Sequence, residues 1–189
     1  APPYGEVKES LTLLLGPDGK ADLNPSQVFV SWPLSDPNLQ ITLSKTQFSC
    51  ENTGEQVVGI LIKNQSGQTW EESIKLLIKD QTVPILIPKN LTLPLDVTKG
   101  VLEITAEQVL QEFGDNCGIK SLTISKNRFT CEDLGKEFSI AIRAEDNSGN
   151  VTEAVSIVKI ERLEASLVEI SGQTSFCQGE NGVLELSST

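Results

Sequence analysis

The stretch that decides the fold is CGIKSLTISKNRFTCEDLGKEFSIAIRAEDNSGN, from Cys117 to Asn150. Within it Phe138, Ile140 and Ile142 alternate with polar neighbours, as the residues of a half-buried strand do. The segment that ends at Asn150 is rich in Asp, Asn and Gly, which suit tight turns. The stretch therefore predicts a strand, a turn marked by a cysteine, a second strand and a hairpin.

Most of this pattern occurs earlier in the chain as well, from Leu39 to Gly67. Three separate blocks recur at nearly constant offsets: Leu91–Leu95 lies 80 positions after Leu11–Leu15, Ile104–Val109 lies 81 after Leu23–Val28, and Leu122–Gly135 lies 81 after Ile41–Gly54. A constant offset favours a tandem of one unit over a single large domain with two sheets, which is the alternative. The strands are short and separated by turn signals, which is typical of β-sandwiches.

The length of 189 residues accommodates two ordinary domains. We expect an all-β chain with one sandwich at residues 1–82, a second at 83–162, and the first strands of an incomplete third domain at 163–189. A disordered tail is the alternative for this last segment. Each repeat has room for at most one turn of helix, near Gln27 and Gln108.

Acidic residues outnumber basic ones by 26 to 15, which gives a formal charge of −11 at pH 7. Nucleic acid and anionic membranes are therefore poor partners. No apolar run approaches the roughly 18 residues that span a bilayer, so we expect no membrane insertion. The chain has neither an initiator Met nor a leader sequence, which suggests a processed product or a piece of a longer protein.

Four cysteines and no histidine favour disulfides in an oxidising exterior over a zinc site. Cys117 and Cys131 are 14 positions apart, and a bridge between them would contribute roughly 3 kcal/mol. We expect this disulfide. The offset of 81 places Asp36 opposite Cys117, so Cys50 lacks a partner in its own copy. Cys177 also lacks one, so these two are expected to be free or to pair outside the chain; a bridge between them is the alternative.

Carboxylates and amides gather near two turns of the second copy: Asp115, Asp146, Asn147 and Asn150. Calcium takes several oxygen ligands, and loops at one end of a sandwich can converge to supply them. Calcium is accordingly a candidate cofactor at these four residues. The alternative is that Asp, Asn and Gly are present because they suit turns.

No catalytic motif is evident, because acyl transfer lacks its histidine base and no glycine-rich phosphate loop occurs. We expect no enzyme activity. Trp32 and Trp70 are candidates for stacking against a sugar, although packing in a core or an interface is the commoner reason for such residues. They motivate the alternative function, a carbohydrate-binding or accessory module of a secreted polysaccharide-degrading enzyme.

The second copy resembles the Ig-like repeats, related to the HYR and PKD-like groups, of giant Bacteroidota surface proteins. The resemblance rests on a Cys-Gly-Ile turn, a Phe-x-Cys turn with Gly four residues on, and an Asp-x-x-Gly-Asn hairpin. The matching residues are Cys117, Gly118, Ile119, Phe129, Cys131, Gly135, Asp146, Gly149 and Asn150. The first copy keeps Phe48, Cys50 and Gly54 but lacks the Cys-Gly-Ile turn and the hairpin Asp.

This resemblance implies tandem Ig-like sandwiches in an exported cell-surface adhesin, such as those that gliding bacteria display through type IX secretion. It implies an extracellular stalk or adhesive module without catalysis. The expected partners are neighbouring Ig-like domains of the same chain and, beyond them, a surface polysaccharide or another surface protein.

Overall fold

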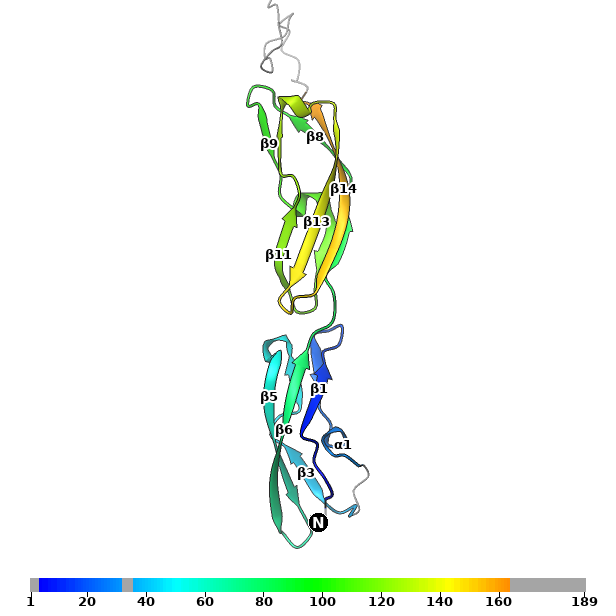
Figure 1. The fold of residues 1–189 in the computed structure, drawn as a ribbon, viewed down its shortest axis with the longest axis vertical. Helices are drawn as coiled ribbons and strands as arrows, with labels where there is room; N and C mark the ends of the chain where they lie inside the picture. The colour runs from blue at the N-terminus through cyan, green and yellow to red at the C-terminus, as the bar shows by residue number, and fades with distance from the viewer. Residues whose placement is uncertain (1–3, 32–35, 164–189) are drawn as a thin grey trace, which may run out of the picture. The chain divides into compact units, whose positions relative to one another are not determined.

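The computed structural model describes residues 4–31 and 36–163, and most of its regular elements are strands (Figure 1). The chain divides into two compact units. The first consists of Ala1–Val83 with the loops Asp115–Gly118 and Asp146–Asn150, and the second of Pro84–Gly114, Ile119–Glu145 and the chain from Val151 onward. The predicted third domain lies, apart from Leu163, outside the described residues.

The first unit is built on a four-stranded sheet in the order β1-β6-β5-β3. Its strands are β1 (Ser10–Leu14), β6 (Thr69–Lys79), β5 (Gly54–Lys63) and β3 (Gln40–Leu43). β1 runs parallel to β6, and the other pairs are antiparallel. Alternate residues of β5 and β6 form the core: Val58, Ile60, Ile62, Ile74, Leu76 and Ile78 are each at most 2% exposed. A short ladder of β2 (Lys20–Asp22) and β4 (Gln47–Ser49) adds the buried Phe48.

The second unit repeats this arrangement, with the sheet order β8-β14-β13-β11. Its strands are β8 (Leu91–Leu95), β14 (Val151–Arg162), β13 (Glu137–Asp146) and β11 (Ile119–Ile124). Two short ladders accompany this sheet: β9 (Val101–Glu103) pairs with β12 (Arg128–Thr130), and β7 (Ile85–Pro88) pairs with β10 (Leu110–Gly114). β8 is parallel to β14, as β1 is to β6. The core again comes from alternate residues, among them Ile140, Ile142, Val158 and Ile160.

The register of strand pairing reproduces the sequence repeat. Lys20 pairs with Ser49 in the first unit, and Val101 pairs with Thr130 in the second, 81 positions later on both strands. On the parallel edge, Leu11 pairs with Leu76 and Leu91 pairs with Val158. The predicted fold class, tandem Ig-like β-sandwiches, is therefore confirmed for the two units.

A single helical turn stands at the predicted place in each repeat, α1 (Pro25–Val28) and η2 (Glu107–Val109). The side-chain oxygen of Gln27 accepts the Asn24 amide at 2.7 Å, and that of Gln108 accepts the Thr105 amide at 2.9 Å. Two further turns follow β4 and β12: η1 (Cys50–Asn52) and η3 (Cys131–Asp133). Within the described residues, no helix has the length and apolar character needed to cross a membrane.

Candidate functional site: a cluster of three carboxylates

Three carboxylates meet within the first compact unit: Asp80, Asp115 and Asp146. One oxygen of each lies within 4.8 Å of one oxygen of the others. Asp80 directly follows β6, Asp115 follows β10, and Asp146 ends β13. Asp146 is fully buried and Asp80 is 6% exposed. The structure thus brings together the two predicted aspartates and adds a third that sequence reasoning missed.

The hairpin turn fixes the position of Asp146. Its Oδ1 accepts the backbone amides of Ser148 and Asn150, both at 2.8 Å, as an aspartate that opens a turn commonly does. Its Oδ2 accepts the Asn150 side-chain amide at 2.7 Å. Gly149 has a φ of +90°, which only glycine adopts readily, so the sequence DNSGN specifies this turn. The same local signals that predict the hairpin therefore also place the carboxylate.

The predicted amide ligands have other contacts. Asn150 Nδ2 also donates to the backbone oxygens of Asp80 and Thr82, at 3.3 and 3.0 Å. Asn147 Nδ2 donates to the Cys117 oxygen at 2.9 Å. In this arrangement both residues turn amide nitrogens, not oxygens, toward their partners, so they hold the loops that carry the carboxylates.

Asp80 and Asp115 are tied into the same network. Asp80 Oδ1 accepts the Thr82 amide at 3.0 Å and the Asn116 side-chain amide at 3.2 Å. Asp115 Oδ1 accepts the Cys117 amide at 2.8 Å. No sequence signal marked Asp80. In the second repeat the equivalent position still belongs to strand β14, whereas in the first repeat the strand has already ended, so comparison of the repeats does not point to a loop at Asp80.

Two buried oxygens at this place have no hydrogen-bond partner among the described residues, Asp115 Oδ2 and Asn116 Oδ1. Buried polar atoms are nearly always paired, so such an atom points to a bound water or ion. Burial raises the pKa of the Asp115 carboxyl, and the neighbouring carboxylates of Asp146 and Asp80 raise it further, against the lowering effect of the Cys117 amide. The described residues contain no ion pair between a Lys or Arg and any of the three carboxylates.

The donor set fits a calcium ion. Calcium binds oxygens at about 2.3–2.6 Å, so ligands on opposite sides of it lie about 5 Å apart. The separation of at most 4.8 Å among the three oxygens matches this span, and the unpaired Asp115 Oδ2 leaves a lone pair available. All the ligands are oxygens, which excludes the thiolate and imidazole chemistry of zinc sites.

The predicted disulfide between Cys117 and Cys131 is wrong. Cys117 bonds to Cys50, 67 positions away, with the two Cα atoms 5.3 Å apart. The expectation that Cys50 lacks a partner in the chain is therefore also wrong. Cys131 is itself disulfide-bonded, and Cys177 lies outside the described residues.

The direction of β11 explains this error. β11 begins two residues after Cys117, and its six extended residues carry the chain about 20 Å away before β12 leads to Cys131. A disulfide needs Cα atoms about 5–6 Å apart. Cys50 and Cys131 open equivalent turns, whereas Cys117 has no counterpart in the first repeat.

The tryptophans give little support to a sugar-stacking platform. Trp32 lies outside the described residues. Trp70 is partly buried against the core of the first unit, and its ring meets that of Tyr4 edge to face, with the centroids 5.9 Å apart. The Tyr4 hydroxyl donates to Glu72 at 2.6 Å, and this bond is the main reason that its pKa is raised. Trp70 is thus explained by packing.

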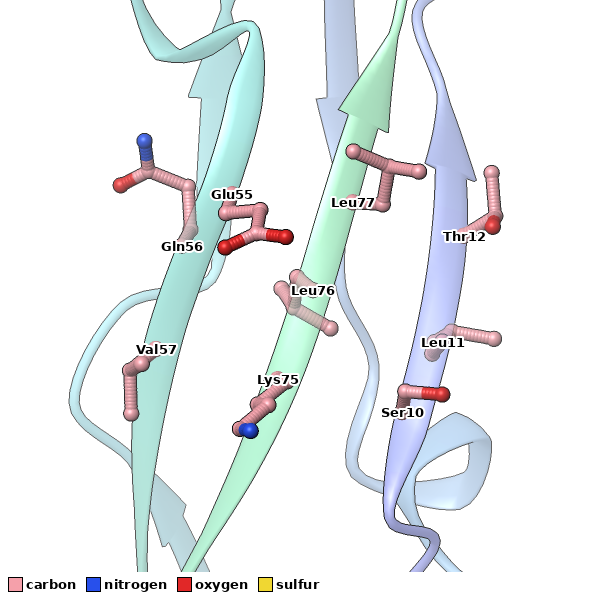
Figure 2. A pocket seen from close by; sticks show the side chains of 9 residues that line it. All are labelled: Ser10, Leu11, Thr12, Glu55, Gln56, Val57, Lys75, Leu76 and Leu77. Atoms are coloured by element: carbon pink, nitrogen blue, oxygen red, sulfur yellow. The ribbon is translucent and has the colours of Figure 1, made fainter.

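A shallow groove of about 310 Å³ lies over β1, β6 and β5 of the first unit (Figure 2). Figure 2 shows Glu55, Val57 and Lys75 along its neighbouring strands β5 and β6. Val57 is 70% exposed. Apolar side chains such as Leu11 and Leu77 line the groove together with polar and charged ones, and the lining residues include no group of converging polar atoms that would define a ligand.

Comparison with known proteins gives no family. No protein-family model matches the chain, and neither does any curated protein. Solved structures with some likeness include repeats EC1-2 of human mucin-like protocadherin (11% identity, TM-score 0.38, covering 82% of this chain and 97% of that one). Repeats EC1-4 of Drosophila N-cadherin are another (10% identity, TM-score 0.36, covering 85% and 48%). Scores at this level identify neither a family nor an activity.

Proposed function

We propose that this chain is a segment of Ig-like repeats from a large bacterial cell-surface protein, in which it acts as an extended stalk or adhesive module without catalysis. The observation that carries the proposal is the duplicated architecture, in which both units have the same strand order and the same register. Proteins that repeat one small domain gain length, and length is what a stalk requires.

Several finer points belong to the same proposal. The domains end near residues 82 and 162, and the rest of the chain begins a third Ig-like domain. The parent protein is an extracellular Bacteroidota adhesin, exported by type IX secretion and serving adhesion and gliding. Its partners are neighbouring Ig-like domains and a surface polysaccharide or protein. The disulfide and the charge of −11 support an oxidising exterior and argue against nucleic acid.

Small-angle scattering tests the stalk. A compact chain of 189 residues has a radius of gyration of about 16 Å. A stalk predicts a clearly larger value and an elongated distance distribution. A radius near 16 Å would contradict it.

A second function is carried by a separate observation, the carboxylate cluster. Asp80, Asp115 and Asp146 hold one calcium ion, which completes the pairing of the buried Asp115 Oδ2. The ion supplies positive charge to three carboxylates that would otherwise repel one another. Because it binds the folded state and not the unfolded chain, it stabilises the first unit by mass action.

Thermal unfolding in calcium and in a chelator tests this second function. At a calcium concentration of about 100 times the dissociation constant, the expected stabilisation is roughly 2.7 kcal/mol, which corresponds to an increase in Tm of about 15 °C for a domain of this size. Magnesium serves as the control, because its bonds to oxygen are shorter. An identical Tm in calcium and in chelator would overturn the calcium site.

A further inference from the structure

The disulfide and the carboxylate cluster share one short loop, Asp115–Gly118. Cys117 forms the bridge to Cys50, and Asp115 stands two residues before it. The Cys117 amide donates directly to Asp115 Oδ1 at 2.8 Å. The residue that carries the covalent bond therefore also orients the carboxylate.

The other contacts described for this loop are hydrogen bonds. Asn116 Nδ2 donates to the Gly16 oxygen at 3.0 Å and to Asp80 at 3.2 Å. Asn147 Nδ2 donates to the Cys117 oxygen at 2.9 Å. The backbone amide and Nδ2 of Asn147 also donate to the Gly118 oxygen, at 3.3 and 3.4 Å. All of these contacts are hydrogen bonds, each of modest net value. The disulfide is the one covalent link among the contacts described for this loop.

The Cys50–Cys117 disulfide packs closely against Gly19. Gly19 has a φ of +70°, and a Cβ atom there would lie 2.8 Å from Cys50 Sγ and 2.9 Å from the Asn116 oxygen. The glycine thus lets the Asn116 backbone and the sulfur of Cys50 approach the same turn. Because Cys50 Sγ and the Asn116 oxygen both pack against Gly19, the position of the disulfide constrains Asn116, the residue next to Asp115.

Electrostatics oppose this placement of Asp115 when no cation is present. Asp80 and Asp146 are both buried and both carry like charge close to it. Like charges at this distance repel, and burial strengthens the repulsion. With the disulfide intact, the loop cannot move far in response. Without it, the loop is free to carry Asp115 away from the other two carboxylates.

We propose that the Cys50–Cys117 disulfide controls calcium binding at Asp80, Asp115 and Asp146, and that bound calcium in turn protects this disulfide from reduction. The inference rests on the calcium site proposed above. Reduction by a dithiol breaks the bond between the two sulfurs: the dithiol supplies two electrons and two protons, Cys50 and Cys117 become thiols, and the dithiol becomes its own disulfide. Thermodynamic linkage makes the two effects equal in size. The factor by which reduction of the disulfide weakens calcium affinity is the factor by which bound calcium lowers the equilibrium constant for reduction.

Isothermal titration calorimetry with calcium alone, on the oxidised full chain and on the Cys50→Ser/Cys117→Ser double variant, tests the first half. Couplings between sites are commonly about 5- to 150-fold, so we expect at least a fivefold weaker affinity in the variant. Absence of binding to the oxidised wild-type chain would overturn the calcium site itself. Binding to wild type with equal affinity in the variant would overturn only the control by the disulfide.

The second half is measured on the wild-type chain and so does not depend on the variant folding. Reduction by dithiothreitol is followed in calcium and in chelator, and peptide mass spectrometry separates the Cys50 and Cys117 thiols from that of Cys131. Calcium is expected to shift the reduction midpoint of Cys50–Cys117 toward higher dithiol by at least fivefold. The matched control is Asp146→Asn, in which calcium should have no effect. Equal midpoints with and without calcium in a wild-type chain that binds calcium would contradict the proposal.

Discussion

Two equivalent hairpin turns, Asn64–Gln68 in the first repeat and Asp146–Asn150 in the second, have nearly the same hydrogen bonds. Asn64 Oδ1 accepts the Gln68 amide at 2.9 Å and the Ser66 hydroxyl at 2.8 Å, while Asp146 Oδ1 accepts two backbone amides at 2.8 Å. An amide oxygen therefore suffices to build the turn. What the aspartate adds is a buried charge beside two other carboxylates.

The comparison separates two kinds of residue. Positions shared by both repeats make the sandwich. The cluster joins Asp115 and Asp146, which are present only in the second repeat, to Asp80 of the first, and the disulfide joins the unshared Cys117 to Cys50. Substitutions at shared positions and at unshared positions should therefore have different effects.

The largest effects are expected at a shared core position. Phe48 and Phe129 lie 81 positions apart, are 3% and 0% exposed, and each has a lysine ammonium over its ring, at 5.1 and 4.9 Å. Phe48→Ala and Phe129→Ala should each lower the unfolding free energy of their own unit by about 3–5 kcal/mol. Hydrogen exchange with mass spectrometry reads each unit separately. A loss below about 1 kcal/mol at either position would show that the copies do not share a core.

The next effect concerns the two turns themselves. Asp146→Asn gives the second turn the chemistry of the first and should abolish the rise in Tm of about 15 °C caused by calcium. The amide oxygen can still accept the backbone amides, so the unit should fold. The reciprocal variant Asn64→Asp is the control. Among the described residues, no carboxylate cluster lies at this turn, so the variant should show the same calcium-dependent rise in Tm as wild type and no second one.

A smaller effect of opposite sign is expected for Asp115→Asn in chelator. Two carboxylates about 5 Å apart repel by roughly 3 kcal/mol at an effective dielectric constant of about 20, and relaxation reduces this value. The variant should thus be about 1 kcal/mol more stable than wild type without calcium and less stable with it, as urea unfolding can show. A loss of stability in both conditions would mean that Asp115 is only a structural residue.

The pH dependence of the same variant follows from the raised pKa of Asp115. The pKa of the Asp115 carboxyl is higher in the folded state than in the unfolded state. Its protonated form therefore stabilises the fold at pH values below the pKa of the unfolded state, and this contribution is lost as the pH rises through the pKa of the folded state. In chelator, the stability advantage of Asp115→Asn over wild type should therefore grow as pH rises through this range. A constant difference between pH 3 and pH 7 would contradict the repulsion.

The smallest effect compares the turns after β4 and β12. Asn52 accepts the Ser49 amide at 3.0 Å, and Asp133 accepts the Thr130 amide at 2.9 Å and the Lys126 ammonium at 3.0 Å. Burial alone would raise the pKa of Asp133, but these two donors lower it below its usual value. Its stability contribution is present above the unfolded pKa and is lost as pH falls through the folded pKa. Asp133→Asn should remove up to about 1 kcal/mol at neutral pH and none in acid; equal losses at both pH values would contradict this.

The fold could be predicted from sequence because its determinants are local. The alternation of Ile140 and Ile142, the turn glycines and the constant offset are readable along the chain, and each was confirmed. The cluster could be predicted only in part. Asp115 and Asp146 stand in recognisable turns, whereas Asp80 joins them only through the packing of a loop from a distant part of the chain.

The disulfide, like Asp80, could not be predicted from local sequence signals. Spacing along the chain favoured Cys131 as the partner of Cys117, but pairing depends on the distance in space, and β11 separates the two. Comparison of the two copies shows that Cys117 is unshared, but it does not choose between Cys50, Cys131 and Cys177 as its partner. That choice depends on the three-dimensional structure, in which Cys117 pairs with Cys50.

Isothermal titration of the metal-free, oxidised chain with calcium tests the central claim most directly, namely that Asp115 and Asp146, which are unique to the second repeat, form a cation site together with Asp80. The account predicts one calcium ion per chain, weaker binding of magnesium, no binding to Asp146→Asn and unchanged binding to Asn64→Asp. Absence of calcium binding by the wild-type chain, or equal binding by Asp146→Asn, would contradict it.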